Sequence, residues 1–284
     1  MLPDSREEKP GDIESIDRAI HDLLLRRAEL GETAKGGASV SPPPVRAAQA
    51  AKLLRAVLSR HSGRFPVRAL VQIWSDILFA CDTQTKLHVF GGVGVAGFHD
   101  LARTYFGCIA PVIMHNSASA VVHACADDPL AIGLVPPPDS VENGQAWWEQ
   151  LAPAGRPGPR IAQSLPFVRN DSCPDSLPQG FAIGAVEQES TGADTTVLRL
   201  ECHSEMSRAR LQSLLRQAGF EAQILAASRT SAKSVASCLL VGNKGFVAPD
   251  DQRLSSIAAM AGDAIERVAV VGGFADPFDA ARAT

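Results

Sequence analysis

Long apolar runs and paired cysteines are what this sequence most clearly lacks. No stretch of its 284 residues stays apolar for the length of a membrane span, and its acidic start is unlike a signal peptide. The six cysteines are scattered singly, without CxxC spacing, and the seven histidines include no pair four residues apart. We therefore expect a cytoplasmic protein with free thiols, no membrane association, no metal and no cofactor.

An excess of basic residues is missing as well. The chain has 27 Lys and Arg against 31 Asp and Glu, a net charge of −4, which argues against nucleic acid as a partner. A hydrophobic content of 45% with 20% charged residues is typical of a soluble globular protein. The length predicts two domains, or three small ones.

Helical periodicity dominates the sequence from residue 12 to residue 86. Apolar residues recur at steps of three and four between Ile13 and Leu30. Two further helices are expected at 45–61 and from about 66 to 81, with three consecutive prolines before the first of them. Their apolar stripes must pack on one another or on a second copy, so this segment predicts an all-α bundle.

One arginine interrupts the first apolar stripe. Arg27 projects near the centre of the stripe, and Arg46 projects toward the inner face of the second helix. These guanidinium groups either pair with internal carboxylates, of which Asp17 and Asp76 are examples, or bind a dicarboxylate ligand bidentately. The sequence alone leaves both alternatives open.

The pattern changes to alternating strands and helices after residue 86. Residues 87–190 predict a small α/β lobe with a largely parallel sheet, followed by a segment rich in proline and glycine. Residues 195–280 predict strands and helices in the order βαββαβ, which is that of a ferredoxin-like sandwich. The overall expectation is an α+β protein of three domains.

Several short motifs match a known enzyme combination. Ile16-Asp17 followed by LLLRRAEL, then Pro44-Val45-Arg46 and Ile73-Trp74, resembles the all-helical class of chorismate mutase. The rest of the chain resembles enzymes that join this mutase to prephenate dehydratase and an ACT regulatory domain. Gly91–Gly97 resembles the dehydratase's glycine motif, and 135–140 resembles its PIENS segment.

This resemblance implies a function and a set of site residues. It implies rearrangement of chorismate to prephenate in aromatic amino-acid biosynthesis, in an intertwined homodimer, with an amino-acid effector at the ACT-like domain. The reaction needs a held conformer and hydrogen-bond donors rather than a nucleophile. By position, the catalytic residues would be Arg27, Lys35 and Gln84. Arg27 would also bind substrate, together with Arg46, Gln49, Cys81 and Thr85.

Several family positions are nevertheless changed. Pro10 stands where the family has an arginine, and Gln49 and Ala50 stand for its second-helix arginine and glutamate. In the dehydratase-like part, Thr195-Thr196-Val197 replaces a catalytic Thr-Arg-Phe, so dehydratase activity is not expected. Two alternatives to the mutase follow. One is a catalytically degenerate regulatory protein that senses an amino acid or a partner enzyme, and the other is an enzyme acting on another chorismate-like dicarboxylate.

Overall fold

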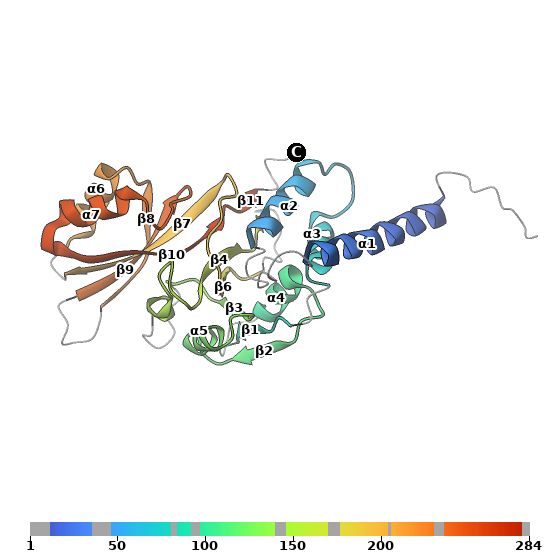
Figure 1. The fold of residues 1–284 in the computed structure, drawn as a ribbon, viewed down its shortest axis with the longest axis horizontal. Helices are drawn as coiled ribbons and strands as arrows, with labels where there is room; N and C mark the ends of the chain where they lie inside the picture. Colours follow the sequence, from blue (N-terminus) through green and yellow to red (C-terminus); the bar gives the residue numbers. More distant parts are fainter. Residues whose placement is uncertain are drawn as a thin grey trace, which may run out of the picture. The chain divides into compact units, whose positions relative to one another are not determined.

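The computed structural model describes residues 12–35, 47–80, 84–91, 97–139, 146–169, 177–203, 206–229 and 236–279. The chain forms two compact units, Met1–Ser41 and Pro42–Thr284. Helix α1 (Ile13–Lys35) belongs to the first unit, and all other elements belong to the second (Figure 1). Within the described ranges, no helix is long and apolar enough to cross a bilayer.

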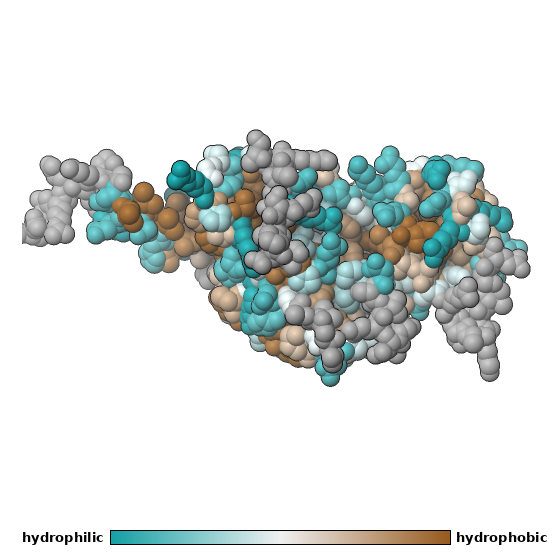
Figure 2. Space-filling view, turned by 180° about the vertical axis from the view of Figure 1, so that it is seen from behind, coloured by the Kyte–Doolittle hydropathy of each residue, from teal (hydrophilic) through white to brown (hydrophobic). Residues whose placement is uncertain are grey.

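Helix α1 carries the predicted apolar stripe on an exposed surface. The helix begins after Asp12, whose carboxylate accepts a hydrogen bond from the Ser15 amide at 2.7 Å, as an N-cap does. Its large apolar side chains are between 40% and 77% exposed, and Figure 2 shows hydrophobic residues along the helix. These side chains are Ile13, Ile16, Ile20, Leu23, Leu24, Leu25 and Leu30.

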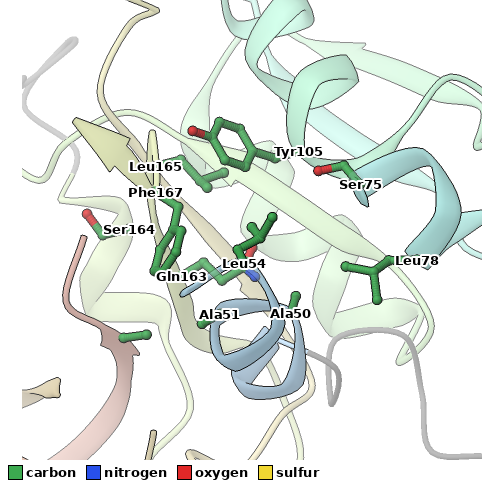
Figure 3. Close-up of a pocket in the computed structure, with 11 residues that line it drawn as sticks. Ala50, Ala51, Leu54, Ser75, Leu78, Tyr105, Gln163, Ser164, Leu165 and Phe167 are labelled. Carbon is green, nitrogen blue, oxygen red and sulfur yellow. The ribbon is translucent and has the colours of Figure 1, made fainter. Parts of the chain in front are cut away.

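Helices α2 (Ala47–Ser59) and α3 (Val67–Phe79) pack on the α/β part of the second unit. The α2 helix packs on strands β4 (Arg160–Leu165) and β10 (Ile265–Ala275) and on α3 (Figure 3), while α3 packs on helix α4 (Phe98–Phe106). Leu54 and Leu58 of α2 and Val71 of α3 are buried in the main core. The two predicted helices are present, but a bundle that includes α1 is not confirmed. The apolar stripes of α2 and α3 are covered by the α/β part of the chain instead.

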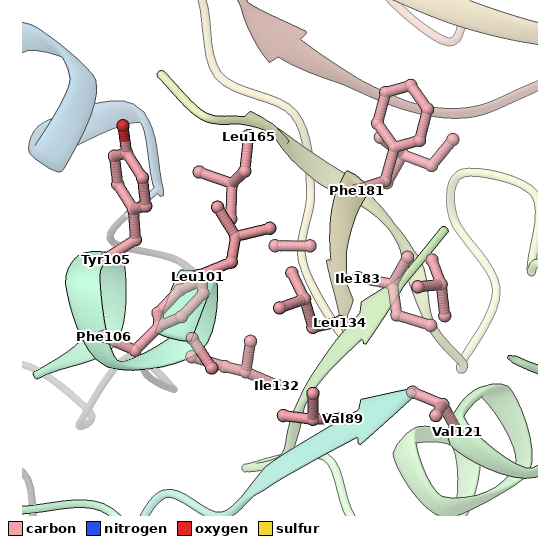
Figure 4. Packing of buried hydrophobic residues seen from close by; sticks show 14 of the residues in the cluster. Val89, Leu101, Tyr105, Phe106, Val121, Ile132, Leu134, Leu165, Phe181 and Ile183 are labelled. Atoms are coloured by element: carbon pink, nitrogen blue, oxygen red, sulfur yellow. The ribbon is translucent and has the colours of Figure 1, made fainter. Parts of the chain in front are cut away.

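The sheet of the second unit has nine strands in the order β2-β1-β3-β6-β4-β10-β7-β9-β8. Strands β1 (Leu87–Phe90), β2 (Val112–His115) and β3 (Ile132–Val135) are parallel. They are joined by α4 (Phe98–Phe106) and α5 (Ala118–Asp127). Figure 4 shows side chains of α4 packed on β1 and β3. This part is the predicted parallel lobe.

Strand β10 (Ile265–Ala275) joins the parallel lobe to the rest of the sheet. It pairs with β4 (Arg160–Leu165) through Gly272 and Ile161, and β4 pairs with β6 (Gly180–Gly184). Gly272 has φ of 128°, and a Cβ there would lie 2.2 Å from the Ile161 carbonyl oxygen. Only glycine allows this close approach of two strands.

The other half of the sheet has the predicted βαββαβ order. Strands β10, β7, β9 and β8 are antiparallel neighbours, and helices α6 and α7 pack with residues of these strands in a second core. The new elements are β7 (Asp194–His203), α6 (Arg208–Gln217), β8 (Ala222–Arg229), β9 (Ala236–Lys244) and α7 (Gln252–Ala261). The short elements are η2 (Trp147–Gln150), η3 (Gly262–Ala264), and the paired β5 (Val168–Arg169) and β11 (Phe278–Asp279).

Candidate functional site

The predicted mutase residues are distributed over both units. Arg27 is exposed on α1, and Lys35 is the last residue of that helix, with a side chain outside the described part. Gln49 is exposed on α2, whereas Gln84 and Thr85, exposed and buried respectively, precede β1. Arg46 and Cys81 lie outside the described residues. Among the described candidates, Gln84 and Thr85 are consecutive in the chain.

A different site is suggested by the topology of the parallel lobe. The chain passes from β1 through α4 to β2 on one side, then through α5 to β3 on the other side of β1. In open α/β sheets, ligands bind outside the carboxyl ends of the strands at such a reversal of strand order. The carboxyl edge of β1, β2 and β3 is therefore the best candidate binding site.

Two helices begin at this edge. Helix α4 follows Gly97, which has φ of 95° and gives the first turn no side-chain cap. Helix α5 follows Ser117, whose Oγ accepts a hydrogen bond from the Ala120 amide at 3.2 Å. In the first turn of α5, Ser119 Oγ accepts a hydrogen bond from Gln150 Nε2 at 3.2 Å. Backbone amides at helix starts favour a negatively charged group, such as a carboxylate.

Two histidines lie against each other on β1 and β2. His88 Nδ1 and His115 Nε2 are 2.8 Å apart, and the ring centroids are 5.0 Å apart. Burial lowers the pKa of His88, and the charge of His115 lowers it further, while Asp128 acts in the opposite direction. Burial therefore favours the neutral form of the His88 imidazole. Sequence reasoning missed this pair, because its members are 27 residues apart.

The described residues offer no group of three or more His, Cys, Asp or Glu side chains that could hold a metal ion. The threonines at the position of the dehydratase motif are also occupied. Thr195 Oγ1 donates to Asp276 Oδ1 at 2.6 Å. Thr196 Oγ1 donates to the Gly245 carbonyl at 3.0 Å and accepts from the Val247 amide at 2.9 Å. Both hydroxyl groups are therefore used in hydrogen bonds within the fold.

Element η2 connects the carboxyl edge with the ferredoxin-like half. Gln150 at its end donates to Ser119 of α5. The carbonyl oxygen of Glu149 accepts a hydrogen bond from Arg199 Nη1 of β7 at 2.7 Å, and its carboxylate accepts one from Ser228 of β8. Burial raises the pKa of Glu149, an effect that Arg199 opposes. Through Glu149 and Gln150, η2 therefore connects α5 with strands β7 and β8.

Comparison with known proteins shows a distant similarity of fold. No protein-family model matches the chain, and no curated protein matches it. Three similar solved structures are GqqA, described as a novel type of quorum quenching acylase, and the prephenate dehydratases from Streptococcus mutans and Arthrobacter aurescens, the latter in complex with L-Phe. The respective identities are 12%, 11% and 13%, and the TM-scores are 0.48, 0.44 and 0.48.

These structures cover 66%, 68% and 67% of this chain, and the matches span 94%, 99% and 90% of their own lengths. The dehydratases belong to the family that the sequence after residue 86 resembles, while a fusion to chorismate mutase is not shown. At such sequence identities and TM-scores, the similarity does not assign a function to this chain.

Proposed function

We propose that this chain is a regulatory protein that binds a small carboxylate, with an aromatic amino acid as the leading candidate, and that it does not catalyse a reaction on it. The observation that carries the proposal is the η2 bridge. It links Ser119, at the start of α5, to Arg199 of β7 and Ser228 of β8 through consecutive residues. A ligand at the carboxyl edge would thereby reach the ferredoxin-like half.

The chemistry of the carboxyl edge suits binding better than catalysis. Among the described residues at this edge, the backbone amides at the starts of α4 and α5 can stabilise a negative charge, and they hold a carboxylate without transferring a proton. The described histidine pair lies on the strands themselves, since His88 is the second residue of β1, and its two facing nitrogens are 2.8 Å apart.

The test combines ligand binding with hydrogen exchange. L-Phe, L-Tyr and prephenate are added to the full chain, and the melting temperature and the amide exchange of β8 are measured. A ligand at 100 times its dissociation constant should stabilise the fold by about 2.7 kcal/mol. Exchange in β8 should slow in the wild type and remain fast in Gln150→Ala, which breaks the bridge while leaving the helix start intact. Binding without any change in β8 would contradict the regulatory proposal.

The proposal includes a homodimer that forms through α1. Ile13, Ile16, Ile20, Leu23, Arg27 and Leu30 follow one another at alternating steps of three and four, the a and d positions of a coiled coil. In a parallel pair, Arg27 would face its own copy. In an antiparallel pair centred between residues 21 and 22, Arg27 would instead lie opposite Ile16 and beside Asp17 of the second copy. The charges therefore favour the antiparallel arrangement.

Chorismate mutase activity is the second candidate, and Arg27 is the specific observation in its favour. A guanidinium among the apolar residues of α1 could bind a carboxylate of chorismate once a second chain covers the helix. The assay follows the loss of chorismate absorbance. Turnover that Arg27→Ala abolishes would replace the regulatory proposal by the mutase. If chorismate binds without turnover, related dicarboxylates are tested as substrates.

A further inference from the structure

In the described sheet, strand β2 has a single neighbour. It stands at one end of the nine-stranded order, and its four residues pair with β1. Ile113 and Met114 are 40% and 49% exposed, so the strand buries little apolar surface. Elements with few buried apolar contacts open at a lower free energy than the strands of a core. Among the described strands of the parallel lobe, β2 is therefore the one that can open alone.

The chain is held firmly on both sides of this strand. Before it, Arg103 Nη1 of α4 donates to the carbonyl oxygens of Cys108 and Ala110 at 3.0 and 2.8 Å. After it, helix α5 buries Val121 and Cys125 in the main core. An opening can therefore be confined to β2 and the first turn of α5, while the rest of the lobe stays folded.

The His88–His115 pair joins the end of β2 to β1 through side chains. The register places His88 beside Gly133 of β3, and a Cβ at Gly133 would lie 2.7 Å from atoms of Val121 and Cys125. Register partners on neighbouring strands share a face of the sheet, so His88 points toward α5, where it is 9% exposed. His115, the last residue of β2, reaches it there at 2.8 Å.

This contact exists in some protonation states and not in others. A hydrogen bond between His88 Nδ1 and His115 Nε2 needs a proton on one nitrogen and a lone pair on the other. The bond can persist when one ring is charged, because the facing nitrogen of the other ring still accepts. When both rings are charged, all four nitrogens carry protons, and two like charges face each other. Double protonation therefore turns the contact from attractive to repulsive.

The surroundings of the pair do not compensate two positive charges. The other titratable side chains on the described elements around it are Lys86 before β1, His123, Cys125 and Asp127 on α5, and Asp128 after it. Burial and the charge of His115 lower the pKa of His88, whereas Asp128 opposes them and itself pairs with Lys86 at 3.5 Å. Burial raises the pKa of Cys125 to about 12, so this thiol stays neutral. His123 and Asp127 are exposed to solvent.

We propose that the His88–His115 pair is a proton-operated latch, which holds β2 on the sheet at neutral pH and releases it, with the first turn of α5, when both rings are protonated. The last proton is bound below the ordinary histidine pKa of about 6.5, because burial disfavours the charged form of His88. The latch acts in the free protein, so it does not depend on the carboxylate ligand proposed above.

Amide hydrogen exchange of two residues tests the latch in the full chain. The Gly91 amide donates to the His115 carbonyl at 2.8 Å across β1 and β2, and the Ile132 amide donates to the Lys86 carbonyl at 3.0 Å across β3 and β1. Between pH 7.5 and pH 5, the protection factor of Gly91, corrected for the intrinsic exchange rate, should fall about tenfold, because a hydrogen bond is lost and a repulsion is gained. That of Ile132 should change less than about twofold. No fall at Gly91, or an equal fall at both amides, would overturn the proposal.

Variants assign the effect to the pair. In His115→Gln, the side chain can still form a hydrogen bond with His88 but cannot take up a proton, so the fall at Gly91 should disappear. His88→Gln should have the same result and serves if the first variant does not fold. His123→Gln, on the exposed side of α5, is the matched control and should keep the tenfold fall. A fall that survives in a folded glutamine variant of the pair, or one that is lost in His123→Gln, would overturn the proposal.

Discussion

Helices α1 and α2 have similar apolar stripes in the sequence, yet the structure treats them differently. The large apolar side chains of α1 are exposed, whereas α2 buries Leu54 and Leu58 against the sheet. Arg55 further ties α2 to the second unit, because its guanidinium donates to the carbonyl oxygens of Ala193 and Asp276, both at 2.7 Å. An amphipathic stripe therefore predicts which face of a helix is apolar, but it does not predict which surface of the protein covers that face.

The largest expected effect comes from truncating a buried side chain of α2. Leu58→Ala should lower the free energy of unfolding by about 2–5 kcal/mol, because it removes buried methyl groups and leaves a cavity. Ile20→Ala on α1 should change the stability of the second unit by less than about 0.5 kcal/mol. Urea unfolding of both variants measures the difference. Similar losses would mean that α1 is packed as α2 is.

The next effect concerns assembly through α1. Leu23→Asp places a charge on the stripe and should raise the dissociation constant of the dimer about 100-fold or more, as measured by analytical ultracentrifugation. Leu25→Asp is the matched control, since Leu25 is equally apolar and exposed but lies off the stripe. Arg27→Asp should also weaken the dimer, and adding Asp17→Arg should restore it if the helices are antiparallel. A monomeric wild type would refute the pairing.

A smaller effect is expected from Arg55. Arg55→Ala removes the hydrogen bonds to Thr191, Ala193 and Asp276. It also removes the cation–π contact in which the guanidinium carbon lies 5.6 Å from the centroid of the Phe167 ring. The loss should be about 2 kcal/mol, because the site is partly exposed. Arg55→Lys should recover only part of it, since an ammonium group cannot reach all of these acceptors at once. Full recovery by lysine would show that charge alone anchors α2.

The smallest effect is a pH dependence confined to the second unit. Because burial lowers the pKa of His88 in the folded chain, the unfolded chain takes up its proton first as the pH falls. Stability should therefore be constant above the unfolded pKa of about 6.5 and decline below it. His88→Gln should flatten this part of the curve in thermal melts at pH 5 to 8. An unchanged slope would assign the decline to other groups.

Periodicity predicted more of the fold than of the site. The three helices, the parallel lobe and the βαββαβ order all follow from local patterns of apolar residues and glycines. Which surface covers α2 and α3 did not follow, because a sheet face and a second helix satisfy the same stripe equally well. The His88–His115 pair and the η2 bridge depend on residues far apart in the sequence, and no local spacing predicts them.

Strand β10 also limits the order in which the nine-stranded sheet can form during protein synthesis. It follows the other eight strands of the nine-stranded sheet in the chain, yet it lies between β4 and β7. Until the ribosome has released residues 265–275, the facing edges of both strands have no neighbour. The two halves of the sheet can only join at the end, and Gly272 is where they meet. A nascent chain stalled before this strand would present two open strand edges to chaperones.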